Sequence, residues 1–455
     1  MEISYQKIIS EVQRYRHFIL GNDESLKDYP HSLKDVGKVV IIASSSRSGS
    51  SLLYHMLKQL PGIYAPSGET VPFLKINNLL TDMSDSEIIH PLKTDDLTYA
   101  HLSRDILQDC LIWNSEPIGL HNICIDEYVR NLALRFAIQW PCIGFDFPEF
   151  SCIALRVIEQ HFAEYTYFKI EEFYLTLIQE LRHAYPGINP YYYDINEFKI
   201  RTFFPEMPML LNPPDSIIIE EPRFILIYPH KHISQIDLKE KTLLIKDPGN
   251  SYRMKFIKDL FPAAQIKVIH LTRNPAASIN GLIDGWLHRG FYSANLKEYL
   301  EQDQSLPPRL RIKGYSDRYE WGQWWWNFDR PPSWEQYIES TLEEVCAFQW
   351  SANNNQLMTM SQYGLKMCRV NFEDIIGNVQ TRKNVFLKLL EFMQLDSQLI
   401  TPLNLDNLPL IQSTAKPIGA RWKRRESSIL DVINGPEIME TSHQLGYHYE
   451  KIGEW

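Results

Sequence analysis

The sequence lacks any apolar run of the roughly 18 residues that a membrane-spanning helix needs. Its first ten residues, MEISYQKIIS, also lack the charged and apolar regions of a signal peptide. These two absences predict a cytoplasmic protein without a membrane span. Positive charge is not in excess either, because 46 Lys and Arg stand against 56 Asp and Glu, for a formal net charge of −10. A nucleic acid is therefore not expected as the main partner.

Cysteine is scarce, and its spacing does not suit a metal module. The six cysteines form no CxxC pair and no Cys/His cluster at zinc-ligand spacing, so we expect no bound metal. Internal repeats and low-complexity tracts are absent as well. At 455 residues, 44% of them hydrophobic and 22% charged, the composition excludes collagen-like, coiled-coil and disordered classes. A chain of this length buries a sizeable core without disulfides.

Four short apolar runs, each bounded by polar or turn residues, predict buried strands. They are KVVIIA from Lys38, TLLIK from Thr242, QIKVIHLT from Gln265 and LKMCRV from Leu365. Apolar stripes at helical spacing follow the first and the third run. Strands that alternate with helices predict an α/β fold, in which a parallel sheet is covered by flanking helices.

The alternation of strands and helices lapses between residues 96 and 237, where aromatic-rich helical stretches precede a Pro-rich passage, FFPEMPMLLNPPD. We interpret 96–237 as a large, mainly helical insertion that covers a pocket. It divides a core made of residues 37–95 and 238–455, and residues 1–36 are expected to form an N-terminal helical segment. A second irregular region contains WGQWWW from Trp321, which is either a packed aromatic layer or the wall of a ligand site.

The segment SSSRSGSSLL joins the first strand to its helix, with Gly49 in the turn. Such a loop directs backbone N–H groups and a helix N-terminus at one point, which attracts a tetrahedral anion, and Arg47 adds a fixed positive charge. The loop is not a Walker A motif, because GxxxxGK followed by Ser or Thr is absent. Asp247 is the one weak candidate for a Mg²⁺ ligand. A Ser-rich turn without a ligand is the alternative for this segment.

Several motifs, taken in order, resemble those of sulfotransferases that use 3'-phosphoadenosine 5'-phosphosulfate (PAPS), in particular bacterial and tyrosylprotein sulfotransferases. RSGSSLL is similar to the family's loop for the 5'-phosphosulfate, and HLTRNPAAS to its element for the 3'-phosphate. Two segments resemble the family sequence that precedes this element: KDP at 246–248 and, after it, LFPAAQIKVIHL. CRVNFEDII is similar to the strand and turn that follow it, and STAKPIGARWKRR to the C-terminal loop that closes over the cofactor. The resemblance implies a P-loop-like sulfotransferase fold.

The resemblance also implies a role for each matching residue. The 5'-phosphosulfate would be held by Arg47, Ser48, Gly49, Ser50 and Ser51. Arg273 would bind the 3'-phosphate. Family members usually have a Ser eight residues after that Arg; this sequence has Gly281 there, and Ser278, on nearly the same helix face, could substitute for it. In the closing loop, the matching cofactor-binding residues are Lys416 and Arg421.

Sulfuryl transfer to a hydroxyl needs a base for the acceptor's proton and cations for the leaving phosphate, and in principle no metal. Glu69, in APSGETVPF, is similar to a GE segment that supplies the base in tyrosylprotein sulfotransferases; a helix cap or a salt bridge is its alternative role. His55 follows the loop but lies away from the apolar stripe of its helix, as a surface histidine would. His270 lies inside an apolar strand, as a core histidine would. We predict Glu69 as the base, assisted by Arg47, with His55 as the second candidate.

The sequence thus predicts an enzyme that transfers a sulfuryl group from PAPS to a hydroxyl and leaves 3'-phosphoadenosine 5'-phosphate (PAP). The acceptor is expected to be a small molecule, a natural product or a lipid. One alternative is a nucleotide-dependent kinase on a related P-loop fold, and another is a non-catalytic anion-binding module. An aromatic-rich insertion suits an acceptor with an apolar body, although sugars also stack on aromatic rings. The sequence identifies neither the acceptor nor the oligomeric state.

Overall fold

The computed structural model describes residues 4–21, 31–93, 95–113, 116–229, 231–288, 290–401, 403–412 and 419–454. Their centre is a seven-stranded sheet in the order β4-β3-β2-β5-β1-β6-β9. In chain order the strands are β1 (Lys38–Ala43), β2 (Ile63–Pro66), β3 (Cys110–Ile112), β4 (Lys231–His232), β5 (Thr242–Lys246), β6 (Gln265–Thr272) and β9 (Lys366–Asn371). The four predicted strands are β1, β5, β6 and β9, so this part of the prediction is confirmed.

Five strands of the sheet, β2, β5, β1, β6 and β9, pair in parallel. Two short strands, β3 and β4, add to one edge in antiparallel pairing. Lys38 at the start of β1 lies opposite both Thr242 of β5 and Gln265 of β6. Because these three strands start in register, their carboxyl ends meet at one edge of the sheet, which is where open α/β sheets bind ligands.

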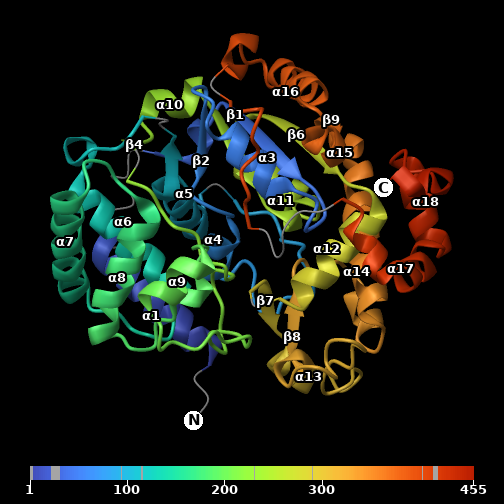
Figure 1. Ribbon diagram of the computed structural model, residues 1–455, viewed down its shortest axis with the longest axis horizontal. Helices are drawn as coiled ribbons and strands as arrows, with labels where there is room; N and C mark the ends of the chain where they lie inside the picture. Colours follow the sequence, from blue (N-terminus) through green and yellow to red (C-terminus); the bar gives the residue numbers. More distant parts are fainter. Residues whose placement is uncertain are drawn as a thin grey trace.

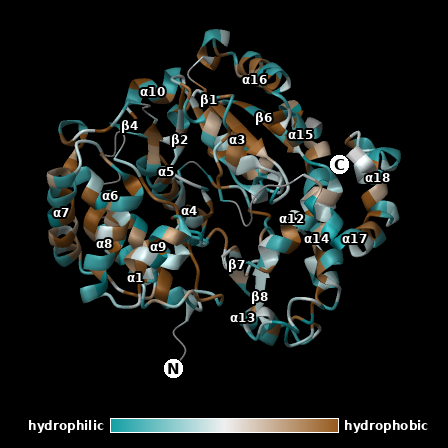
Figure 2. Cartoon of the chain, viewed as in Figure 1, coloured by the Kyte–Doolittle hydropathy of each residue, from teal (hydrophilic) through white to brown (hydrophobic). Residues whose placement is uncertain are grey.

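Helices cover both faces of the sheet, as the predicted α/β class requires (Figure 1). One face, with Val40 and Ile42, packs against α3 (Ser50–Leu57) and α16 (Val379–Met393). The opposite face, with Val39 and Ile41, packs with α1 (Tyr5–Leu20), α4 (Val71–Ile76), α5 (Leu97–Asp109) and α11 (Met254–Leu260). Figure 2 shows apolar residues gathered on the central strands, while hydrophilic residues lie on the outer turns of peripheral helices.

The predicted insertion is mainly helical. Besides α5 it contains α6 (Ile125–Gln139), α7 (Phe147–Glu164), α8 (Ile170–Ala184) and α9 (Glu197–Phe203), while α10 (Gln235–Glu240) crosses its predicted boundary at residue 237. Helices α6 to α9 gather on one side of the sheet in Figure 1, and their aromatic side chains form a core of their own. The aromatic richness of this segment therefore serves internal packing.

A third group of elements lies on the other side of the sheet. It comprises α12 (Pro275–Trp286), β7 (Tyr292–Asn295), α13 (Lys297–Gln302), β8 (Trp325–Asn327), α14 (Leu342–Met358), α17 (Glu426–Ile433) and α18 (Pro436–Gln444). The short helix α15 (Phe372–Ile376) instead packs with α16 on the face of the sheet that α3 covers. Trp326 of the WGQWWW segment is buried in the third group, with its ring centroid 5.3 Å from that of Trp286 and 5.1 Å from that of Trp334. For this tryptophan the packed aromatic layer is the correct interpretation.

Short 3-10 helices complete the described chain, at Leu33–Asp35, Leu120–Asn122, Pro190–Tyr192, Pro248–Ser251, Trp321–Gln323, Trp334–Tyr337, Met360–Tyr363, Ser397–Ile400, Arg421–Arg425 and Tyr449–Glu454. Within the described ranges, every helix is too short or too polar to cross a membrane.

Candidate functional site

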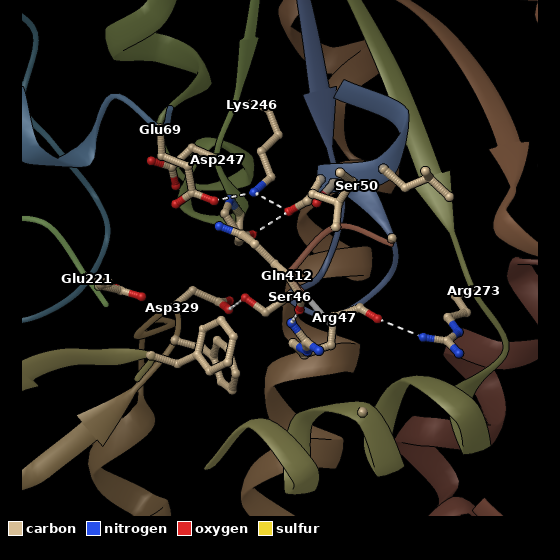
Figure 3. A pocket seen from close by; sticks show the side chains of 18 of the residues that line it. Ser46, Arg47, Ser50, Glu69, Glu221, Lys246, Asp247, Arg273, Asp329 and Gln412 are labelled. Carbon is tan, nitrogen blue, oxygen red and sulfur yellow. Dashed lines mark hydrogen bonds and ion pairs between the residues drawn. The ribbon is translucent and has the colours of Figure 1, made fainter. Parts of the chain in front are cut away.

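A cavity of about 720 Å³ lies at the carboxyl ends of β1, β5 and β6 (Figure 3). This volume is in the range of small-molecule sites. The lining comes from segments far apart in the sequence: residues 46–52, 246–249, 273–281, 408–412 and 419–422 all contribute. The loop after the first strand and the element after the third strand, which the sequence analysis singled out separately, therefore face one space.

The loop between β1 and α3 makes a tight turn directly before the start of a helix. Gly49 has φ +94°, and a Cβ built there would lie 2.1 Å from the ring of Phe372, so this turn requires glycine. Helix α3 begins directly after it, and the first N–H groups of a helix have no intrahelical partner. Two contacts join the loop to residues 408–412: Ser51 Oγ donates to Gln412 Oε1 (2.8 Å), and Arg47 Nη1 donates to the Gln412 carbonyl (3.1 Å).

Three arginines, Arg47, Arg273 and Arg421, line the same part of the cavity. Arg273 Nη1 donates to the carbonyl of Arg47 (2.9 Å), and its guanidinium lies 4.9 Å from the centre of the Phe372 ring. Burial, and then the charge of Arg273, lowers the pKa of Arg47 to about 10. Burial also lowers the pKa of Arg273, and Arg421 adds to this effect against the opposing charge of Glu373. Cations that lower one another's pKa in this way suit an anion with several charges.

Glu69 lies at the cavity beside a cation that the sequence analysis gave no role. Lys246, the last residue of β5, contacts the Glu69 carboxylate through Nζ and donates to Ser51 Oγ (3.1 Å). The side chain of Glu69 is 36% exposed, whereas that of Lys246 is 9% exposed. The salt bridge considered for Glu69 therefore exists, and it leaves the carboxylate accessible next to the loop. The sequence did contain a signal for Lys246, because this lysine ends a predicted strand and begins the KDP motif. The pairing of that strand with β1, which brings Lys246 to the loop, appears only in the structure.

Three predicted residues do not reach the described lining of the cavity. His55 packs its ring edge-on against Trp113, with 5.9 Å between centroids, and burial lowers its pKa to about 4. Ser48 is buried, with its Oγ 2.7 Å from that of Ser45. Ser278 is buried as well, and its hydroxyl donates to the Arg273 carbonyl (3.4 Å). Lys416 lies outside the described residues.

Gly281 has a steric role at the contact between α12 and the loop. A Cβ at Gly281 would lie 3.2 Å from Cβ of Arg47, which is tighter than most such contacts. Its neighbour Asn280 lines the cavity and accepts a hydrogen bond from Arg425 (2.6 Å). Asn280 is therefore one of the described lining residues, whereas Ser278 is not.

Carboxylates that the sequence analysis did not select gather in the rest of the cavity. Burial, and then Glu87, raises the pKa of Asp329 to about 6, and Asp329 accepts a hydrogen bond from Ser46 Oγ (3.0 Å). Burial, and then Glu69, raises the pKa of Glu221 to about 7. Glu221 lines the cavity and belongs to the predicted insertion at 96–237. These residues come from separate parts of the chain and form no motif.

Asp247, the weak candidate for a magnesium ligand, has other partners. It accepts a hydrogen bond from the backbone N–H of Gly249 (2.8 Å) and pairs with Arg253 (3.3 Å). Burial is the main reason that its pKa rises to about 7. In the portion of the chain that the structure describes, no group of three or more His, Cys, Asp or Glu residues is arranged to hold a metal ion.

Fold and cavity together define an α/β protein with a cavity at the carboxyl edge of its sheet, one part of which is lined by Arg47, Arg273 and Arg421. No family model and no curated protein matches the chain. Among solved structures it is similar to the sulfotransferase domain from the curacin biosynthetic pathway, with 13% identity and a TM-score of 0.36 over 91% of this chain and 99% of that one. The sulfotransferase domain of the Synechococcus PCC 7002 olefin synthase gives 13% identity and a TM-score of 0.31 over 91% and 96% of the two chains. A sulfotransferase from Alicyclobacillus acidocaldarius has 10% identity and a TM-score of 0.31, over 91% of this chain and 97% of that one. With TM-scores below 0.5 these similarities carry no weight for function, which has to be argued from the cavity.

Proposed function

We propose that the protein is a sulfotransferase that moves a sulfuryl group from PAPS to a hydroxyl of a small-molecule acceptor. The observation that supports this most strongly is the convergence of three features on one cavity: the loop at 46–51, Arg273 and Glu69. A natural product or lipid as acceptor, and a cytoplasmic location, stay predictions from the sequence.

The residues of the arginine-lined part fit a donor with two separate anionic groups. Arg47, Ser51 and the N–H groups at the start of α3 would hold the 5'-phosphosulfate. Arg273 and Arg421 would hold the 3'-phosphate. The lowered pKa values of Arg47 and Arg273 support this, because a bound polyanion would remove the repulsion among buried cations. Phe372 and residues 408–411, which also line the cavity, offer apolar surface for a base.

The bound donor supplies a sulfuryl group, whose transfer breaks the S–O bond to the phosphate while the acceptor hydroxyl loses its proton. The Glu69 carboxylate is proposed to take that proton, since it is the accessible carboxylate beside the loop. Lys246 orients Glu69 and places its own positive charge beside Ser51, where the leaving phosphate gains negative charge. Its two contacts thus connect the base with the anion loop.

The test is incubation of the purified chain with PAPS and a panel of hydroxylated compounds, with release of PAP as the readout. We expect slow release with water alone and faster release with an accepted compound. Arg47→Ala should abolish both. Arg369→Ala, which removes an exposed arginine bonded to the Gln444 carbonyl (3.0 Å), is the matched control and should release PAP normally. Transfer of phosphate from ATP without any release of PAP would favour the kinase alternative.

A further inference from the structure

The cavity has a second half that the proposed donor does not use. Six carboxylates line it: Glu69, Asp82, Glu87, Glu221, Asp247 and Asp329. Four cations share it: Lys75, Lys246, Arg253 and Arg330. If every group were ionised, negative charge would exceed positive charge here, even before an anionic donor arrives in the adjacent half.

Two of these four cations are held mainly by backbone carbonyls. Lys75 Nζ donates to the carbonyls of Ile218 (2.8 Å) and Ser293 (2.7 Å). Arg330 donates to the carbonyls of Thr81 and Asp82, at 3.1 Å each. Neither side chain makes an ion pair with a carboxylate among the described residues, so both neutralise the carboxylates only through space.

Asp82 gives independent evidence that the carboxylate-lined half of the cavity binds a ligand. This residue is 7% exposed and lines the cavity, yet its Oδ1 accepts no hydrogen bond from any described residue. A buried acceptor left without a donor costs about 1 to 3 kcal/mol, and more when it is charged. A ligand that brings a hydrogen-bond donor with positive charge would recover this energy.

Glu221 and Asp329 complete the arrangement. Figure 3 shows the Glu221 side chain directed into the cavity, towards Asp329 and Ser46 and across from Glu69. Burial and neighbouring carboxylates raise the pKa of Glu221 and Asp247 to about 7. A cation bound among them would favour their ionised forms.

We propose that the acceptor carries an ammonium or similar cationic group, which binds among Asp82, Glu221 and Asp329 while its hydroxyl lies at Glu69. This inference rests on the proposed sulfotransferase function and names its substrate class. It differs from the expectation of an apolar acceptor, because the aromatic rings of the insertion pack into their own core. Charge complementarity of this kind mainly provides specificity, by rejecting neutral and anionic hydroxyl compounds.

The test is calorimetric titration of the full chain, first with PAP and then, in the PAP-bound state, with matched pairs of probes. Tyramine and 4-ethylphenol form one pair, and glucosamine and glucose form the other; within each pair the main difference is the ammonium group. We expect the ammonium compound to bind at least 10-fold more tightly in one pair or both. Glu221→Gln should reduce that preference below threefold, while affinity for PAP stays within twofold.

Glu391→Gln is the matched control, since Glu391 is an exposed glutamate of α16 outside the cavity. It should keep the full preference. Asp329→Asn provides a second variant if Glu221→Gln does not fold, and it should also reduce the preference. Absence of any ammonium preference in both pairs, or a preference that survives both substitutions, would overturn the inference. Failure of PAP itself to bind would instead refute the proposed function.

Discussion

Arg273 offers the most specific test of how the cavity divides its ligand. Arg273→Ala removes the hydrogen bond to the Arg47 carbonyl and the guanidinium that lies over Phe372. It also removes a cation that lowers the pKa of Arg47. The 3'-phosphate would lose its main partner, whereas the loop that holds the 5' end would keep its own charge.

A hydrogen bond to a charged group contributes about 1.5 to 3 kcal/mol. The affinity for PAP should therefore fall about 10- to 150-fold, since about 1.4 kcal/mol corresponds to a factor of ten. Adenosine 5'-phosphate lacks the 3'-phosphate, so its affinity should change less than threefold. Loss of the Arg273 charge also weakens the attraction of the cavity for the 5'-phosphate, which accounts for the small loss allowed for this ligand.

The assay is calorimetric titration of wild type, Arg273→Ala and Arg273→Lys with both nucleotides, at one salt concentration. Arg273→Lys keeps the charge but loses the planar guanidinium, and it should fall between the other two. Arg369→Ala serves as the control for removal of an arginine bonded to a carbonyl elsewhere. Equal losses for both nucleotides would refute the placement of the 3'-phosphate at Arg273.

Further predictions concern the base, the neighbouring helix, metal dependence and pH. Glu69→Gln should lower the release of PAP roughly 10²- to 10⁴-fold and leave PAP affinity near wild type; near-normal release by a folded variant would exclude Glu69 as the base. Asn280→Ala should weaken PAP binding more than Ser278→Ala, because Asn280 lines the cavity; the reverse order in titrations would contradict this. EDTA should leave PAP affinity unchanged, since the proposed contacts involve no metal; loss of binding would count against the account. Asp329→Asn removes a carboxyl whose pKa is raised to about 6 in the folded state. The contribution of Asp329 to stability falls as pH rises from about 4 to 6, because the native state holds the proton longer than the unfolded state. Denaturant unfolding should therefore show the variant gaining relative to wild type by up to roughly 3 kcal/mol across that range.

The parallel core was predictable because its strands are buried on both faces, which leaves continuous apolar runs such as KVVIIA at Lys38. The turn at 46–51 between strand and helix was predictable because Gly49 and the small residues around it are a local sequence signal, while its role in anion binding stays a prediction. His270 also follows the prediction for a core histidine: it is buried, and its Nε2 lies 3.0 Å from Asn354 Oδ1. In each case the signal is local.

The edge strands and the carboxylate-lined half were not predictable in the same way. Strands β3 and β4 have three and two residues, too few for a periodic pattern. Asp82, Glu221 and Asp329 come from three separate segments, and only tertiary packing brings them together. His55 follows the loop closely in sequence, but the turn of α3 directs it to Trp113, and its role as the second candidate base stays a prediction.

Titration of the wild-type chain with PAP, and separately with ATP and Mg²⁺, tests the central claim most directly. The claim is that the arginine-lined half of the cavity recognises a nucleotide with phosphates at both the 3' and the 5' positions. We predict that PAP binds with at least 10-fold higher affinity than ATP with Mg²⁺, with or without EDTA. Tighter binding of ATP with Mg²⁺, or no binding of PAP, would contradict the account.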